Sequence, residues 1–168
     1  MYQRCTIVAF EPDIDNFPLF KENITKNSIQ GVTYINAALW SEKGTLTLYR
    51  AKGDAWRVDV GCIERDGDQY ESYSVPTVPL APYFVGHGIV DFFKLDVEGA
   101  EESVLVGLAD ELDRVKQIVF EYHEAGTLGR IKSLLKSHGF VEEAAASKGD
   151  RRPASVSSFI NKKLGSRG

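Results

Sequence analysis

The sequence contains few cysteines and no long apolar run. Its cysteines are Cys5 and Cys62, too few for a disulfide framework, so we expect two reduced thiols in an intracellular protein. No apolar stretch approaches the roughly 20 residues of a membrane-spanning helix. The first residues lack the architecture of a signal peptide. These absences predict a soluble, cytoplasmic protein with no membrane partner.

The sequence also lacks a long basic run. Its 20 Lys and Arg residues are outnumbered by 24 Asp and Glu residues, and the formal net charge is −4. This balance disfavours a nucleic-acid partner, because binding to phosphates depends on clustered positive charge. The length of 168 residues, 43% of them hydrophobic, suits one domain over residues 1–168. Within this domain, residues 50–72, which include Trp56, are predicted to form a variable loop or hairpin that covers the ligand-binding site.

Strand-like and helix-like segments alternate along the chain. The expected strands are residues 5–10, 32–39, 45–49, 89–97, 115–122, 140–146 and 156–162, with an extended edge segment at 73–82. The expected helices are residues 16–26, capped by Asp13 or Asp15, 100–112 and 127–138. Such alternation predicts an α/β fold with a mostly parallel sheet and helices on both of its faces.

Polar residues follow several of the expected strands. They are Glu11, Asn36, the pair Asp96 and Glu98, and the pair Glu121 and His123. In open parallel sheets, ligands bind at the carboxyl ends of the strands. The sequence therefore predicts a site at this edge of the sheet.

The most informative segment is residues 90–108, which read VDFFKLDVEGAEESVLVGL. Lys94, Asp96 and Glu98 alternate with apolar residues, so all three charged side chains are expected on one face of the strand. Because burying unpaired charge is costly, this face is predicted to have a function. The alternative is an ion-pair cluster that orders the junction between strand and helix.

This segment resembles the strand-to-helix signature of the FkbM family of S-adenosylmethionine (SAM) dependent methyltransferases. Further similarities are the Phe10-Glu11-Pro12 sequence after a strand, Asn23 and Asn27 in the next helix, and residues 37–39, which read AAL. The resemblance implies a Rossmann-like class I methyltransferase fold. The family begins with a strand and a glycine-rich turn that have no counterpart here, so we expect an N-terminally truncated form of this fold.

The resemblance implies SAM as cofactor and a role for each site residue. Glu11 would bind the ribose hydroxyls, and Asn36, Ala37 and Ala38 would line the adenine pocket. The catalytic group would comprise Lys94, Asp96, Glu98 and His123, placed around the methionine ammonium and the acceptor hydroxyl. No metal is assigned, although Asp96, Glu121 and His123 offer an alternative metal site. The implied activity is O-methylation of a small-molecule or sugar hydroxyl.

A second hypothesis is a non-catalytic relative that keeps the fold for binding or assembly. The strands ending at Glu11 and Val97 would normally flank the strand that this sequence lacks. We expect one of three outcomes: a partner chain or a second copy fills the position, the two strands close on each other, or the fragment is unstable.

Overall fold

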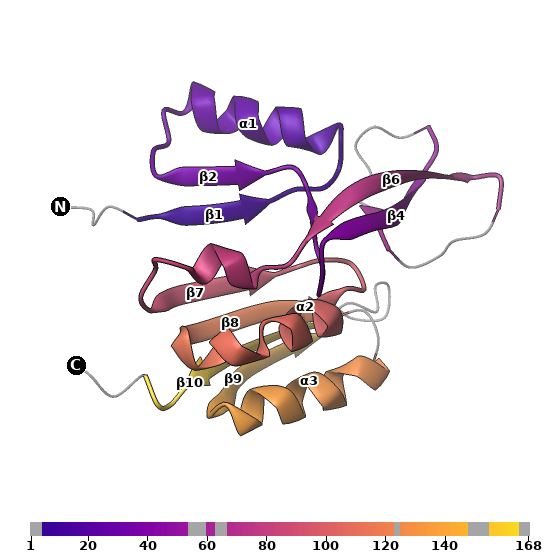
Figure 1. Cartoon of the computed structure of the whole chain (residues 1–168). Helices are drawn as coiled ribbons and strands as arrows, with labels where there is room; N and C mark the ends of the chain where they lie inside the picture. The colour runs from indigo at the N-terminus through magenta and orange to yellow at the C-terminus, as the bar shows by residue number, and fades with distance from the viewer. Residues whose placement is uncertain (1–4, 54–59, 63–66, 123–124, 148–154, 165–168) are drawn as a thin grey trace.

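A computed structural model describes residues 5–53, 60–62, 67–122, 125–147 and 155–164 (Figure 1). Its strands are β1 (Ile7–Phe10), β2 (Val32–Ile35), β3 (Ala38–Leu39), β4 (Gly44–Ala51), β5 (Val60–Gly61), β6 (Tyr70–Val78), β7 (Val90–Leu95), β8 (Val115–Tyr122), β9 (Phe140–Ser147) and β10 (Ser155–Asn161). Its helices are α1 (Asn16–Lys26), α2 (Glu101–Gly107) and α3 (Ala125–Ser137), with 3-10 helices at Ala81–Phe84 and Ala109–Arg114.

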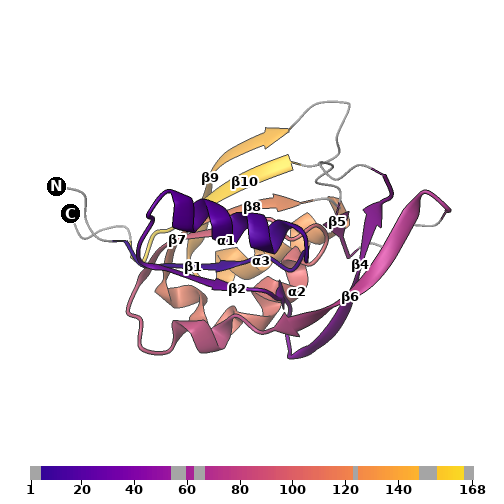
Figure 2. The same ribbon diagram turned by 90° about the horizontal axis from the view of Figure 1, so that it is seen from above.

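The strands form three sheets. One is the parallel pair β1-β2, the second has the order β7-β8-β10-β9, and the third has the order β3-β6-β4-β5. β7 and β8 are parallel, whereas β10 is antiparallel to both of its neighbours. Figure 2 shows α1 on one side of the strands and α2 with α3 on the other. The α/β prediction is therefore confirmed, with mixed rather than mostly parallel sheets.

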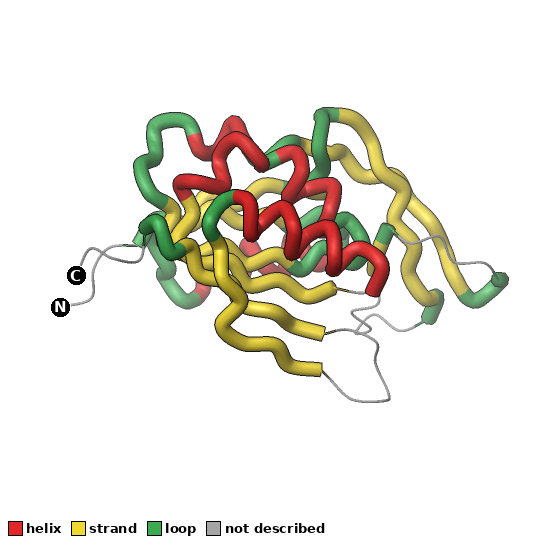
Figure 3. Tube along the Cα trace, turned by 90° about the horizontal axis from the view of Figure 1, so that it is seen from below, coloured by secondary structure: helices red, strands yellow, loops and turns green. Residues whose placement is uncertain are grey.

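The core of the molecule lies around β7, β8 and the two later helices. Figure 3 shows α2 and α3 side by side against the strands. Their inward residues and those of β8 are fully buried, which is what a sheet strand covered by helices requires. The largest of these side chains include Leu105, Leu108, Leu112, Ile118, Phe120 and Leu135.

Two expected strands differ from the structure. Residues 32–39 are not one strand, because the chain leaves β2 after Ile35 and joins a different sheet at β3. The segment at 73–82 was expected at an edge, but β6 lies between β3 and β4. That expectation followed the rule that proline is confined to edges. The rule holds locally, because β3 pairs with β6 only at Thr77 and Val78, and at Pro76 the strand is paired with β4 alone.

The first helix has the predicted bounds, and the structure identifies its cap. Asp13 Oδ1 accepts hydrogen bonds of 2.8 Å from the backbone N–H groups of Asp15 and Asn16. Asp15, at the N-cap position, makes no side-chain capping bond. Phe17 and Tyr34 form an edge contact between α1 and β2. The helix is thus fixed to β1 by the cap and to β2 by packing.

A glycine in the turn before β2 packs closely against the segment that leads into β1, and this contact can be tested. Gly31 has a φ of +78°, and a Cβ atom there would lie 2.5 Å from the carbonyl oxygen of Cys5. Gly31→Ala is expected to destabilise the fold by about 2 to 4 kcal/mol, from left-handed strain plus overpacking. Gly53→Ala is the control, since Gly53 has a φ of +86° and a Cβ atom there would have none of the described atoms beyond its chain neighbours within 4 Å. Chemical denaturation of both variants measures the difference, and equal losses would contradict the contact.

Candidate functional site

A cavity of about 1180 Å³ lies between β1 and β7 and is lined by every residue of both strands. In the described part of the chain, β1 pairs with β2 alone and β7 with β8 alone. We call this space the slot. Figure 1 shows β1 above β7 with their arrows pointing the same way. Direct closure of the two strands, one of the three expected outcomes, is therefore wrong.

Six of the eight predicted site residues line this cavity. Glu11, Ala37 and Ala38 contribute from the side of β1 and β2. The other three come from the end of β7 and the turn that follows it, and they are Lys94, Asp96 and Glu98. Residues far apart in the sequence thus meet where β1 and β7 end.

The remaining two predicted residues have other positions. Asn36 is exposed and does not line the cavity. Its Nδ2 donates to the backbone oxygens of Glu11 at 2.8 Å and Pro12 at 3.4 Å, so it holds the turn after β1. His123 lies outside the described residues, as does Trp56. Among the described residues, no group of three His, Cys, Asp or Glu side chains is placed to hold a metal ion.

Glu11 is half-buried at the end of β1. Its Oε1 accepts a hydrogen bond of 2.9 Å from the backbone N–H of Asp13. Burial raises the pKa of the Glu11 carboxyl above its ordinary value, and the nearby Asp13 charge adds to this, although the N–H bond opposes it. The second carboxylate oxygen has no hydrogen-bond partner in the part of the chain that the structure describes. It is the atom with which Glu11 can bind a ligand.

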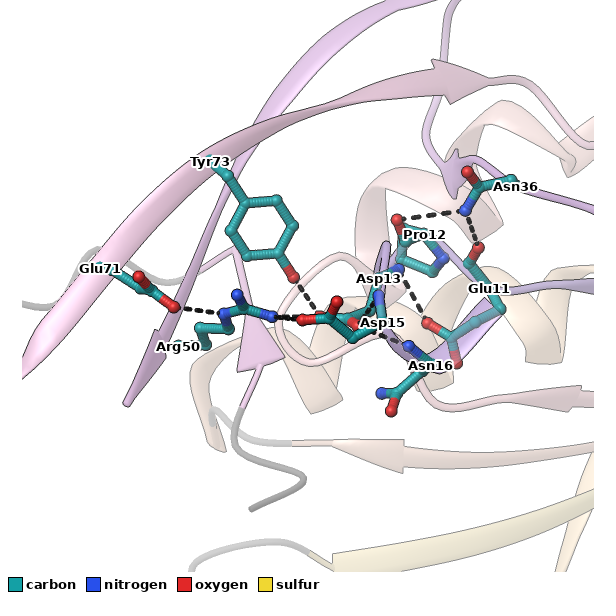
Figure 4. A network of polar contacts seen from close by, with 9 residues as sticks. All are labelled: Glu11, Pro12, Asp13, Asp15, Asn16, Asn36, Arg50, Glu71 and Tyr73. Atoms are coloured by element: carbon teal, nitrogen blue, oxygen red, sulfur yellow. Dashed lines mark hydrogen bonds and ion pairs between the residues drawn. The ribbon is translucent and has the colours of Figure 1, made fainter. Parts of the chain in front are cut away.

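Asp13 is the centre of a polar network that joins β1 to the hairpin of β4 and β6 (Figure 4). Its side chain is 4% exposed, and its Oδ2 accepts a hydrogen bond from the Tyr73 hydroxyl. Arg50 lies 3.7 Å from the same oxygen, and it also pairs with Asp15 and, at 2.6 Å, with Glu71. The network fixes the loop that carries Glu11.

The network changes the acidity of its members. Burial tends to raise the pKa of Asp13, but the Tyr73 hydroxyl, two backbone N–H groups and the Arg50 charge together hold it below its ordinary value. Burial, and then the bond to Asp13, raise the pKa of Tyr73. Both groups therefore keep their charge states, Asp13 ionised and Tyr73 neutral, near neutral pH.

The sequence did not predict the roles of Arg50 and Tyr73. The alternating pattern at residues 45–49 correctly indicated one arm of a hairpin, and in the hairpin Arg50 lies opposite Glu71. What brings Arg50 to Asp13 is the packing of this hairpin against the end of β1. That contact joins residues 37 positions apart, and local periodicity contains no signal for it.

The charged residues at the end of β7 lie in an exposed ion pair and in the tight turn that follows the strand. Lys94 Nζ lies 2.9 Å from Asp96 Oδ2, and their side chains are 64% and 34% exposed. Such an exposed pair contributes less than about 1 kcal/mol to stability. The prediction that this face has a function was based on the cost of burying unpaired charge. That cost does not apply to Lys94 and Asp96, because both are exposed to solvent and paired. Lys94 thus pairs with one of the two carboxylates that follow it in this segment.

The turn after β7 has a left-handed backbone at Glu98, with a φ of +48°, and at Gly99, with a φ of +106°. The carbonyl oxygen of Glu98 accepts from the Cys62 backbone N–H at 3.3 Å. Glu101 Oε1 accepts from the Gly99 N–H at 3.1 Å, which secures the entry to α2. A Cβ on Gly61 would lie 3.0 Å from the Glu98 oxygen, so the strand β5 packs closely on this turn.

Comparison with solved structures identifies the fold. A methyltransferase FkbM from Methylobacillus flagellatus KT superposes with a TM-score of 0.59 at 14% identity, over 92% of this chain and 36% of that chain. A ribosomal protein L11 methylase from Lactobacillus delbrueckii subsp. bulgaricus gives 0.51 at 15% identity, over 94% and 58%. The fold is that of the class I methyltransferases.

Sequence comparison then identifies the family. The family model described as the Methyltransferase FkbM domain matches residues 1–142. The chain belongs to the FkbM methyltransferase family, as the motif at residues 90–108 predicted.

The chain is similar to curated proteins that are longer than it. It is 36% identical over 78 residues to the 31-O-demethyl-FK506 methyltransferase FkbM of Streptomyces tacrolimicus, which covers 44% of this chain and 30% of that protein. It is 30% identical over 160 residues to Methyltransferase 1 of Beauveria bassiana (strain ARSEF 2860), which covers 83% of this chain and 64% of that protein. The chain thus spans from about a third to just under two thirds of these relatives.

Proposed function

We propose that the chain is the site-bearing part of a SAM-dependent methyltransferase that acts on the hydroxyl of a small molecule or a sugar. The observation that carries the proposal is the meeting of six predicted residues in one cavity at the ends of β1 and β7, where an α/β sheet binds ligands. The name of the Streptomyces relative refers to a methyl group on oxygen, which supports a hydroxyl acceptor.

The residues present fit the adenosine part of SAM. Glu11 offers a carboxylate oxygen for ribose hydroxyls, and it is held in place by the Asp13 N–H. Ala37 and Ala38 are 2% and 7% exposed, so they supply a wall of small side chains beside it. The cavity volume of about 1180 Å³ exceeds the roughly 300–1,000 Å³ that holds a drug-sized ligand.

We assign the part of the site that activates the acceptor hydroxyl to Asp96. SAM supplies a methyl group on a positively charged sulfur, from which an oxygen nucleophile can accept it. Asp96 takes the proton of the acceptor hydroxyl, which makes that oxygen a better nucleophile. Lys94 binds Asp96 Oδ2 at 2.9 Å and leaves Oδ1 for the acceptor. Glu98 is assigned to the methionine ammonium group, and His123, which lies outside the described residues, to proton transfer.

The first test is binding of the cofactor to Glu11. Glu11→Ala is expected to weaken SAM binding by about 1 to 3 kcal/mol, the range for a hydrogen bond to a charged group, or about 5 to 150-fold in Kd. Isothermal titration of SAM into both proteins measures the change. Glu22→Ala is the control, since Glu22 is an exposed carboxylate on α1. Unchanged affinity in folded Glu11→Ala protein would remove the ribose assignment.

The second candidate is a non-catalytic relative that uses the slot for binding or assembly. The observation that favours it is the open slot itself, in a chain that spans 64% or less of the two curated relatives named above. The same titration separates the two candidates. Saturable heat of SAM binding favours the enzyme, and no heat at millimolar SAM favours the binding module.

A further inference from the structure

The two halves of the proposed site belong to different sheets. The ribose half, with Glu11, follows β1, which pairs with β2. The acceptor half, with Asp96 and Glu98, follows β7, which pairs with β8. The distance between the halves matters, because a misplacement of about 1 Å can lower the rate of a reaction about 100-fold. The sheet β3-β6-β4-β5 contacts both halves, and we call it the bridging sheet.

The first contact of the bridging sheet is with the loop that carries Glu11 (Figure 4). The Tyr73 hydroxyl, on β6, donates to Asp13 Oδ2, and the Arg50 guanidinium, on β4, lies 3.7 Å from the same oxygen. The backbone N–H of Asp13 in turn donates to Glu11 Oε1 at 2.9 Å. The Asp13 side chain is 4% exposed, and polar contacts away from water are stronger than those at the surface. The orientation of the Glu11 carboxylate therefore depends on β4 and β6.

The second contact is with the turn after β7. The N–H of Cys62, the residue after β5, donates to the Glu98 carbonyl oxygen at 3.3 Å. A Cβ atom on Gly61 would lie 3.0 Å from that oxygen and 3.1 Å from the Glu98 Cβ, so the two backbones are in close contact. Glu98 has a left-handed φ of +48°, a conformation that a non-glycine residue keeps only where its surroundings hold it. β5 is part of those surroundings.

The two contacts come from neighbouring positions of one sheet. On β4, Arg50 is paired with Val60 of β5. The preceding residue, Tyr49, is paired with Gly61. The whole length of β4 is also paired with β6, and β6 is paired with β3, whose Ala38 lines the cavity. The parts of this sheet that reach the two halves of the site are thus joined by continuous strand pairing.

We propose that the bridging sheet sets the distance between the ribose half and the acceptor half, with Tyr73 and Gly61 as positioning residues. Tyr73 acts on Glu11 through Asp13. Gly61 acts on the turn at Glu98 by allowing its close approach. The inference deepens the proposed function and rests on it, because it concerns the geometry of the same site. The alternative is a sheet that contributes stability alone.

Two substitutions alter one contact each. Tyr73→Phe removes the hydroxyl that binds Asp13 and keeps the aromatic ring. Gly61→Ala adds a methyl group against the Glu98 carbonyl group. The φ of Gly61 lies outside the left-handed region, so alanine there changes the contact without left-handed strain.

Each variant has a matched control outside the cavity. Tyr49→Phe removes a tyrosine hydroxyl from β4, and Tyr49 does not line the cavity. Gly107→Ala adds a methyl group 3.0 Å from the Ser41 Cα atom, as close as the contact at Gly61. Neither Gly107 nor Ser41 lines the cavity. The controls thus repeat the two chemical changes at positions that do not border the site.

The first measurement is NMR of the chain without ligand. Each of the two variants is expected to shift backbone amides in both halves, at residues 11–16 and at residues 96–99. Both controls are expected to leave these two segments unchanged. Shifts confined to the segment next to each substitution would overturn the proposal, because the halves would then be held independently. Where Gly61→Ala does not fold, Tyr73→Phe decides alone, by the presence or absence of shifts at residues 96–99.

The second measurement compares SAM with adenosine by isothermal titration. On the proposed assignment, SAM reaches both halves and adenosine reaches the ribose half alone. Each variant is expected to weaken SAM binding by about threefold or more and adenosine binding by less than about twofold, as for residues that couple separate groups. Loss of stability alone would weaken both ligands equally. Equal weakening, or unchanged affinity for SAM, would overturn the proposal.

The two measurements separate this inference from the function on which it rests. If the unmodified chain binds neither SAM nor adenosine, the proposed function fails, while the ligand-free NMR measurement still decides whether the bridging sheet fixes the two halves. If the chain binds SAM and the shifts stay local, the proposed function holds and the bridging role is wrong.

Discussion

Asp96→Asn is expected to lower the rate of methyl transfer by about 100-fold or more, the usual contribution of a general base. Asparagine keeps the size of the side chain but cannot take the proton of the acceptor hydroxyl. The assay follows labelled methyl groups from SAM to a panel of sugars and other small hydroxylated molecules, with primary amines as the contrasting class. Transfer is expected to the hydroxyl compounds only.

The same strand offers a matched control for Asp96. Asp91 also lies on β7 and also pairs with a lysine, since Lys116 Nζ is 2.5 Å from its carboxylate. It precedes Asp96 by five positions, toward the other end of the slot. Asp91→Asn is expected to retain full activity. Full activity of Asp96→Asn, or transfer to the amines alone, would contradict the assignment of the base and of the acceptor class.

Asp13→Ala is expected to lower the free energy of unfolding by about 2 to 4 kcal/mol, as much as we expect for Gly31→Ala. The substitution removes the cap of α1, leaves the Tyr73 hydroxyl without its acceptor, and removes one of the three carboxylates near Arg50, which keeps Asp15 and Glu71. Urea denaturation followed by circular dichroism measures the change. Asp15→Ala is the control, because its side chain is 65% exposed, and the expected loss is below about 1 kcal/mol.

The contribution of Asp13 depends on pH with a defined sign. Its pKa is lowered in the folded state from 3.8, so the folded protein keeps this carboxylate ionised more readily than the unfolded chain does. The stabilisation is complete above pH 3.8 and is lost as the pH falls through the folded-state pKa. Asp13→Asn is expected to lose this acid-sensitive part. An unchanged pH profile below 3.8 in that variant would show that Asp13 contributes no such linkage.

Much of the fold follows from local patterns in the sequence. The bounds of α1 and β8 match the prediction because each segment has clear periodicity. The end of α3 is marked by Gly139 just after it, which has a φ of +89°. The family was recognisable because residues 90–108 combine a strand, a turn with Gly99 and a helix in one continuous motif. Six of the eight predicted site residues line one cavity where β1, the segment after β2, and β7 end, so a rule about strand ends was enough to expect them near one another.

Long-range contacts were not predictable in the same way. Tyr73 reaches Asp13 across 60 positions, and neither residue has a local pattern that names the other. The break between Ile35 and Ala38 falls on Asn36 and Ala37, which are weak strand formers. It was missed because the pairing of Ala38 and Leu39 with β6 is a long-range contact. Lys94 was expected within a covered sheet, and it is exposed because its strand borders the slot.

The most direct test of the account is to locate SAM on the chain by NMR. Titration of SAM into isotopically labelled protein is expected to shift the backbone amides of Glu11 and Asp13, of Ala37 and Ala38, and of residues 96–98, all of which border the cavity. The amides of β9 and β10 are expected to stay unchanged. Absence of shifts at millimolar SAM, or shifts confined to β9 and β10, would contradict a cofactor site at the ends of β1 and β7.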